Sequence, residues 1–167
     1  MARRLVFFAC ICVNLVFALS DMPLKGIPPS ITPELLFALA KMGHGDTIVI
    51  ADANFPAEAI AAHTTVKGTI RVANCTTASL LYDILALINL DSYAAMPGIV
   101  MDMVETDKEK GLEVPAYTLL RNAVQDSITF SVIERFDFYD MARGAFCVVQ
   151  TTDPSPYANC IISKGVC

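Results

Sequence analysis

The α/β character of this chain is clearest in residues 42 to 56, which read Met-Gly-His-Gly-Asp-Thr-Ile-Val-Ile-Ala-Asp-Ala-Asn-Phe-Pro. The apolar run from Thr47 to Ala51 predicts a buried strand, with a glycine-flanked turn before it and Asp52 directly after it. Loops beyond the carboxyl ends of strands in open α/β sheets often bind ligands. A histidine titrates near neutrality, so His44 and Asp52 are candidates for an acid/base pair. The structural alternative is a helix end, a surface histidine and a turn-forming aspartate.

Predicted helices and strands alternate along the rest of the chain. Thr32, Pro33 and Glu34 form a typical helix start, and Gly43 ends that helix. Further helices are predicted at residues 57–62, 79–88, 117–124 and 138–144, and further strands at residues 69–72, 98–104, 128–133, 146–151 and 159–163. The charged residues 105–111 predict a solvated loop. The alternation predicts the α/β fold class, as a single three-layer domain whose mostly parallel or mixed sheet is flanked by helices.

Residues 1–20 form an N-terminal extension, and the domain itself is predicted to occupy residues 22–167. Two arginines followed by an apolar run of signal-peptide length, with small residues near its end, suggest cleavage before Asp21. The run is short for a membrane span and contains Asn14, so no stable membrane association of the mature domain is expected. Alternatively, Met22 is the natural start, and the residues before it come from another start site or from an error in the coding sequence.

The composition excludes some partners. The formal net charge is −5, and the lysines and arginines form no patch, so neither nucleic acid nor an anionic membrane is an expected partner. Asp46 adds a third possible ligand beside His44 and Asp52, but with two histidines in the chain and no cysteine nearby we expect no metal site.

The cysteines leave the compartment open. Cys75, Cys147, Cys160 and Cys167 lie outside the extension and form no CxxC pair, so they can be free or paired. Asn74-Cys75-Thr76 is an N-glycosylation sequon, which matters only if the chain enters the secretory pathway.

Five short motifs follow one another along the chain. Each has a structural explanation when it is taken singly, such as a turn-forming aspartate or aromatic core packing. The motifs are Met-Gly-His-Gly-Asp at 42–46, Ala-Asp-Ala-Asn-Phe-Pro at 51–56, Leu-Asp-Ser-Tyr at 90–93, Arg-Phe-Asp-Phe-Tyr at 135–139 and Tyr-Ala-Asn at 157–159. Taken together, from about Lys25 to Gly165, they resemble the L-fucose mutarotase / D-ribose pyranase family, and more closely its fucose mutarotase branch.

This resemblance implies a cofactor-free isomerase that interconverts the α and β anomers of a free monosaccharide, with L-fucose as the expected sugar. It also implies a homo-oligomer with sites near subunit contacts. Such a reaction needs a base on the anomeric hydroxyl and an acid on the ring oxygen. By the resemblance, the proton donor is His44, the further active-site positions are Asp91 and Tyr139, and the substrate-contacting positions are Asp52, Met101, Tyr139, Tyr157 and Asn159.

The chain departs from the family pattern at Arg71-Val72-Ala73-Asn74, where relatives carry Arg-Ala-Asp-Gly. This change puts the local loop structure in question, and with it the sugar preference or the oligomer contacts. The alternatives are therefore a D-ribose pyranase, a mutarotase for a related sugar, and a monosaccharide-binding protein without catalysis. The resemblance favours the cytoplasm and the extension favours the secretory pathway; we expect the cytoplasm.

Overall fold

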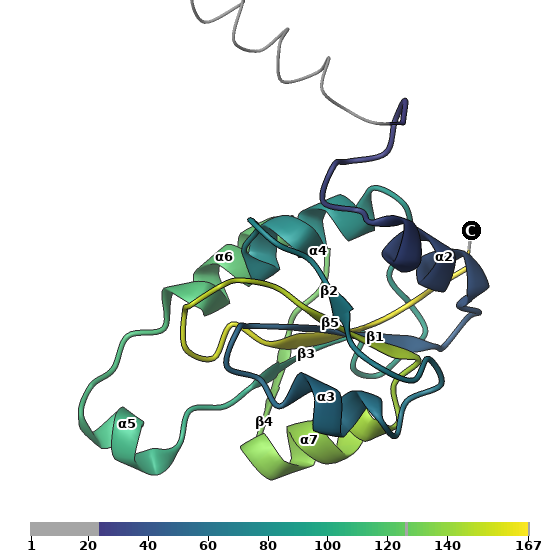
Figure 1. Cartoon of the computed structure of the whole chain (residues 1–167). Coiled ribbons are helices and arrows are strands. Elements are labelled where there is room, and N and C mark those ends of the chain that lie inside the picture. Colours follow the sequence, from purple (N-terminus) through teal and green to yellow (C-terminus); the bar gives the residue numbers. More distant parts are fainter. Residues whose placement is uncertain (1–23, 126, 167) are drawn as a thin grey trace, which may run out of the picture.

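A six-stranded mixed sheet forms the centre of the molecule (Figure 1). The computed structural model describes residues 24–125 and 127–166, so the proposed signal peptide and Cys167 lie outside the described residues. In the order β2-β5-β1-β6-β3-β4, the strands are β2 (Ile70–Arg71), β5 (Cys147–Gln150), β1 (Thr47–Ala51), β6 (Cys160–Ser163), β3 (Gly98–Met101) and β4 (Ser131–Ile133). β6 runs antiparallel to β1 and β3, and the other neighbouring pairs are parallel.

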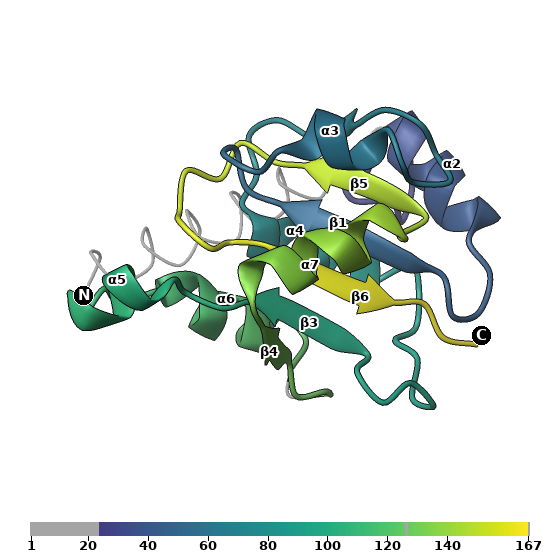
Figure 2. The ribbon, with the colours of Figure 1, turned by 90° about the horizontal axis from the view of Figure 1, so that it is seen from below.

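Helices cover both faces of this sheet. α2 (Pro33–Lys41), α4 (Thr77–Leu85) and α6 (Pro115–Ala123) lie on one face, and α3 (Ala57–Ala61) and α7 (Arg135–Arg143) lie on the other (Figures 1 and 2). The predicted three-layer α/β domain is therefore confirmed. Among the described residues, no helix has the length and apolar character needed to cross a membrane.

The side chains of β1 explain why its sequence is apolar throughout. Ile48 and Ile50 belong to the core under α2, α4 and α6, whereas Val49 and Ala51 belong to the core under α3 and α7. A strand that is buried on both faces needs apolar residues at every position, instead of the alternation of a half-exposed strand. The run from Thr47 to Ala51 was correctly predicted for this reason.

Several predicted segments have other bounds in the structure: β3 ends at Met101 and not at residue 104, β4 begins at Ser131 and not at residue 128, and α4 covers Thr77–Leu85 and not residues 79–88. Two further differences have a clear physical cause. Residues 105–111 are not wholly a loop, because α5 (Glu105–Glu109) forms there, with two acidic residues in its first turn and Lys108 in its last. These charges complement the helix dipole. α7 begins at Arg135 and not at Phe138, because the Glu134 side chain caps it by accepting hydrogen bonds from backbone N–H groups.

The two edges of the sheet position the candidate residues. We call the edge where β1 ends the carboxyl edge, and the edge where β1 begins the amino edge. Since β6 is antiparallel to β1, its first residues reach the carboxyl edge and its last residues reach the amino edge. Asn159 therefore lies beside Asp52 at the carboxyl edge, whereas Asp91 donates its N–H to the Ser163 carbonyl at the amino edge.

Candidate active site

His44 and Asp91 form an ion pair at the amino edge. The Nε2 atom of His44 lies 3.1 Å from Oδ1 of Asp91. The carboxylate is buried, while the imidazole keeps 48% of its side-chain surface exposed. The exposed ring of Tyr93 packs edge-on against His44, with 6.1 Å between the ring centroids. The pair thus presents a carboxylate-oriented imidazole to solvent.

The surroundings of Asp91 favour its ionised form. Its Oδ1 atom accepts a hydrogen bond of 2.9 Å from the N–H of Tyr93. This bond, with the neighbouring His44, lowers the pKa of Asp91 against the opposing effect of desolvation. Asp91 is therefore a carboxylate at neutral pH, and it can fix the orientation of the imidazole and stabilise its protonated form.

The backbone around His44 depends on two glycines. Gly45 has a φ of +83°, a conformation that L side chains rarely adopt, and its N–H donates to the Lys164 carbonyl. Gly165 packs so closely on the Leu90 carbonyl that a Cβ atom would overlap it. These contacts bring the turn before β1, the segment before Asp91 and the C-terminal segment together at the amino edge.

Asp46 stabilises this turn from within. Its Oδ2 atom accepts a 2.7 Å hydrogen bond from the N–H of Gly43. Within the described residues, no group of three or more His, Cys, Asp or Glu side chains is placed to hold a metal ion.

Asp52 and Asn159 form a buried pair at the carboxyl edge. Nδ2 of Asn159 donates to Oδ2 of Asp52 at 2.7 Å, and the Asp52 N–H donates to Oδ1 of Asn159 at 3.0 Å. The other carboxylate oxygen accepts from the N–H of Asn54. Burial raises the pKa of Asp52 in spite of these hydrogen bonds. A carboxylate of this kind is a stronger base than a solvated one.

Tyr139 belongs to α7 and lies near the carboxyl edge, where it packs on the loop that follows Asp52. Its ring packs edge-on against Phe55, with 5.5 Å between the centroids. Burial is the main cause that raises the pKa of Tyr139, and the charge of Asp52 adds to it. The phenol therefore stays neutral at physiological pH and can donate a hydrogen bond.

Tyr157 occupies a strained position in the loop before β6. Its φ is +59°, which is uncommon for a residue with a bulky side chain. Its hydroxyl donates to Oδ2 of Asp107 at 2.7 Å and accepts from the N–H of Val104 at 3.3 Å. Strained backbone of this kind concentrates at functional sites.

Met101 is the last residue of β3 and is buried in the core under α3 and α7. Its carbonyl accepts a 2.6 Å hydrogen bond from the hydroxyl of Tyr117 on α6. Burial raises the pKa of Tyr117 to about 12, so this phenol acts as a donor.

Within one copy of the chain, His44 does not pair with Asp52, because β1 lies between the two residues. A strand rises about 3.3 Å per residue, so the four steps from Thr47 to Ala51 alone span roughly 13 Å. The partner of His44 is Asp91, which is 47 residues away in the sequence and reaches the amino edge beside the end of β6. The candidate residues thus form two groups at opposite edges of the sheet.

Gln150 holds the loop that follows β1 and carries Asp52, a role that the sequence did not predict. Its Nε2 atom lies 3.1 to 3.3 Å from the carbonyl oxygens of Asp52, Ala53 and Phe55. Its Oε1 atom accepts a 2.8 Å hydrogen bond from Arg71. The only signal for this role was a polar residue at the end of the apolar β5 segment.

The loop that departs from the family pattern lies between β2 and α4 and is held by hydrogen bonds. Asn74, in this loop, adopts a φ of +58°. Asparagine is one of the few non-glycine residues that tolerate this region. The Asn74 N–H donates to Oγ1 of Thr152, which ties the loop to the segment after β5.

The fold is a three-layer α/β domain. Its candidate site contains imidazole, carboxylate and phenol side chains, which are groups that can transfer protons. Residues 25–167 match the sequence model of the RbsD / FucU transport protein family. Fucose mutarotase from Mus musculus is 46% identical over 145 residues, which cover 85% of this chain and 94% of the mouse protein. The chain therefore belongs to the RbsD / FucU family, as its motifs predicted.

Two solved structures extend this comparison. The fucose mutarotase from Streptococcus pneumoniae, in complex with L-fucose, superposes with a TM-score of 0.75 at 36% identity, covering 86% of this chain and 99% of that one. RbsD from Bacillus subtilis, complexed with D-ribose, superposes with a TM-score of 0.63 at 21% identity, covering 87% and 99%. At this lower identity the likeness shows the fold alone.

Proposed function

We propose that this protein is a cofactor-free L-fucose mutarotase, an isomerase that interconverts the α and β anomers of the free sugar. The observation that carries the proposal is the His44–Asp91 pair, in which a buried carboxylate orients a half-exposed imidazole. Similarity to the mouse and pneumococcal fucose mutarotases supports the substrate. Anomer exchange needs only proton transfers around ring opening, and imidazole, carboxylate and phenol groups can perform them.

In the proposed reaction, protonated His44 donates a proton to the ring oxygen. The bond between C1 and the ring oxygen breaks, and its electron pair goes to that oxygen. In one concerted relay, the anomeric hydroxyl gives its proton to the phenol oxygen of Tyr139 as the phenol gives its own proton to a solvent water, so an open-chain aldehyde results. Rotation about the C1–C2 bond presents the other carbonyl face, and the ring closes with both transfers reversed. Asp91 stabilises the imidazolium that alternates with neutral His44.

The carboxyl edge is the proposed sugar-binding surface. Asp52 and Asn159 bring a carboxylate and an amide together, and such groups bind adjacent sugar hydroxyls. Tyr157 supplies an aromatic face, and Met101 supplies an apolar neighbour. Tyr139 is both a proton-transferring and a sugar-contacting residue, because its phenol can contact the sugar while it relays the proton.

We further propose that the complete site requires a second copy of the chain. His44 and Asp91 lie at the amino edge, while Asp52 and Tyr139 lie toward the carboxyl edge, so one copy does not surround a monosaccharide with all of them. Each group carries an exposed aromatic residue. Tyr93, beside His44, is 78% exposed, and Phe136, beside Tyr139, is 61% exposed. Exposed aromatic residues are typical of protein interfaces.

Mixing two inactive variants tests this shared site. We expect His44→Ala and Asp52→Asn to abolish anomer exchange when each is prepared alone. When the two are unfolded and refolded together, some contacts pair an intact His44 with an intact Asp52, and activity returns. Mixed oligomers that remain inactive, with their mass verified by light scattering, would contradict the shared site.

Sugar preference is tested by NMR magnetisation exchange between anomers, with residues 22–167 and L-fucose, D-ribose or galactose. Faster exchange for L-fucose than for the other two supports the proposed substrate. A preference for D-ribose would instead make the protein a D-ribose pyranase. Binding without exchange for every sugar would indicate a monosaccharide-binding protein that lacks catalysis.

We propose a cytoplasmic location. Among the described residues, Cys75, Cys147 and Cys160 are free thiols, which is typical of a reducing compartment. Burial raises the pKa of Cys147 to about 12, so this thiol is unreactive. The intact mass of the protein from its native source tests the location, because a mature chain that begins at Asp21 or carries a glycan on Asn74 would contradict it.

A further inference from the structure

α5 stands apart from the three-layer body, on the segment that connects β3 to α6 (Figures 1 and 2). It has five residues and no buried side chain. Isolated helices shorter than about 12 residues are marginal in water, so α5 depends on its contacts with the rest of the chain. Those contacts lead to the carboxyl edge of the sheet.

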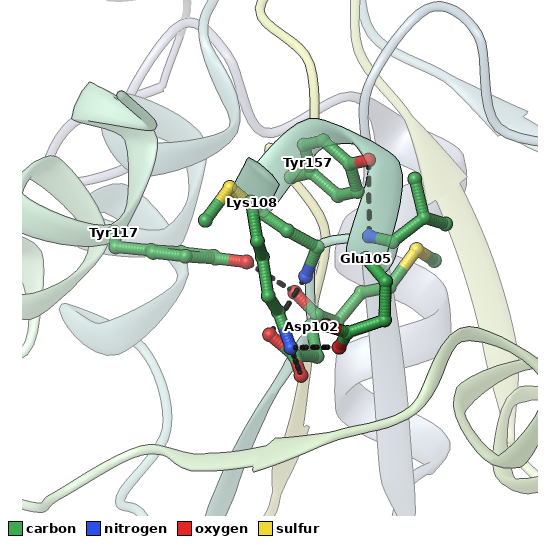
Figure 3. Close-up of polar contacts among 8 residues, drawn as sticks. Asp102, Glu105, Lys108, Tyr117 and Tyr157 are labelled. Carbon is green, nitrogen blue, oxygen red and sulfur yellow. Dashed lines mark hydrogen bonds and ion pairs between the residues drawn. The ribbon is translucent and has the colours of Figure 1, made fainter. Parts of the chain in front are cut away.

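Lys108 is the first of these contacts. Its Nζ atom lies 2.6 Å from Oδ2 of Asp102 and 2.9 Å from Oε1 of Glu105 (Figure 3). The two carboxylates raise the pKa of Lys108. Asp102 directly follows β3, and its N–H donates to the Ile133 carbonyl of β4. Lys108 therefore connects α5 to the end of two paired strands.

Asp107, the neighbour of Lys108, is the second contact. Its Oδ2 atom accepts the hydrogen bond of the Tyr157 hydroxyl at 2.7 Å. The same hydroxyl accepts from the N–H of Val104 at 3.3 Å (Figure 3). The Tyr157 ring is thus held at its tip by a donor and an acceptor from the α5 segment, although its own backbone has a strained φ.

We propose that Asp107 is a positioning residue for the sugar site: its carboxylate fixes the ring of Tyr157 in the orientation that contacts the sugar. Lys108 supports this role by holding α5 against Asp102. The proposal deepens the proposed function, on which it rests, because it assigns α5 the task of shaping the sugar-binding surface. Removal of the Asp107 carboxylate then releases the Tyr157 side chain and weakens sugar binding more than the chemical step.

The geometry also yields a readout that does not depend on activity. A phenol that donates to a carboxylate is favoured in its neutral form, and burial together with Asp107 raises the pKa of Tyr157. Loss of Asp107 must therefore lower that pKa. A loss of global stability that leaves the packing around Tyr157 intact would not move the pKa of this tyrosine.

The test compares Asp107→Ala with Glu109→Ala, which removes an exposed carboxylate from the same helix. Both proteins, labelled with ¹³Cζ-tyrosine, are titrated by NMR, and Tyr157→Phe identifies the Tyr157 resonance. We expect Asp107→Ala to lower the pKa of Tyr157 and to raise the KM for L-fucose exchange about tenfold, with a smaller fall in kcat. We expect Glu109→Ala to change neither the pKa of Tyr157 nor the KM. For Asp107→Glu, we expect both values to lie between those of the wild type and those of Asp107→Ala.

Two results would overturn the proposal: an unchanged Tyr157 titration in Asp107→Ala, or a KM that stays within about twofold of the wild type while the titration moves. Lys108→Met, with Lys67→Met as the exposed control, is expected to shift the Tyr157 resonance in the same direction as Asp107→Ala. Failure of the proposed function is distinguishable, because a wild-type protein that exchanges no L-fucose anomers refutes the mutarotase while the titration still decides whether Asp107 holds Tyr157.

Discussion

Asp52 and Asn159 exchange two hydrogen bonds across the carboxyl edge, one from the Asp52 backbone N–H and one from the Asn159 side-chain amide. The residues are 107 positions apart in the sequence and both are buried. Since a buried carboxylate without donors is strongly unfavourable, the Asn159 amide and the Asn54 N–H together stabilise Asp52 beside the proposed sugar-binding surface.

Asn159→Ala is therefore expected to destabilise the protein. The substitution removes the amide donor from the Asp52 carboxylate and leaves an unpaired buried group, which costs about 1 to 3 kcal/mol of unfolding free energy. Urea unfolding followed by circular dichroism measures the change. Asn122→Ala, at an exposed position of α6, is the control and should change stability by less than about 0.5 kcal/mol. Equal effects of the two substitutions would show that the Asp52–Asn159 pair is not important for stability.

The pH dependence of stability reports on Asp91. Its pKa is lower in the folded protein than its ordinary value of 3.8, so the folded state binds this proton more weakly than the unfolded state does. The stabilisation is therefore fully present above that value and is lost as the pH falls through the lowered pKa. We expect the difference in unfolding free energy between the wild type and Asp91→Asn to shrink as the pH falls below about 5 and through the lowered pKa. A difference that grows on acidification would contradict this sign.

Gln150→Leu tests the support of the Asp52 loop. The amide donates toward three carbonyl groups in residues 52–55, and leucine cannot replace those bonds. We expect a loss of about 1 to 3 kcal/mol of unfolding free energy and a higher KM, because the loop that carries Asp52 loses its anchor. Arg71→Ala removes the donor to the Gln150 side-chain oxygen. The double variant should lose less than the sum of the two single effects, whereas strict additivity would show that the two residues act independently.

Asn74 provides a test of backbone strain. Its φ of +58° suits glycine and is tolerated by asparagine, but it is unfavourable for alanine. Asn74→Ala should therefore reduce the unfolding free energy by about 1 kcal/mol, while Asn74→Gly should leave it within about 0.5 kcal/mol. Thermal unfolding of both variants measures this, and a glycine variant that is less stable than the alanine variant would disprove the assignment of strain.

The sequence predicted those parts of the fold whose cause is local. The strand from Thr47 to Ala51 was predictable because both of its faces are buried, and the first helix was predictable because Thr32 caps it and its apolar residues recur at helical spacing. α5 was missed because it is short and charged, and it has no apolar face to produce a periodic signal.

The arrangement of the site was less predictable. The family motifs identified His44, Asp91 and Tyr139 as candidates, but the spacing along the chain suggested Asp52 as the partner of His44. The antiparallel insertion of β6 between β1 and β3 decides which residues reach each edge, and this topology leaves no trace in local composition. The link between Asp107 and Tyr157 joins residues 50 positions apart and needed the structure for the same reason.

The central claim is that His44, held by Asp91, transfers the proton that opens the sugar ring. The most direct measurement is magnetisation exchange between α and β L-fucose by NMR, with residues 22–167 of the wild type and of His44→Ala, both verified as folded. We predict fast exchange with the wild type and exchange at the uncatalysed rate with His44→Ala. A folded His44→Ala protein that exchanges the anomers as fast as the wild type would contradict the account.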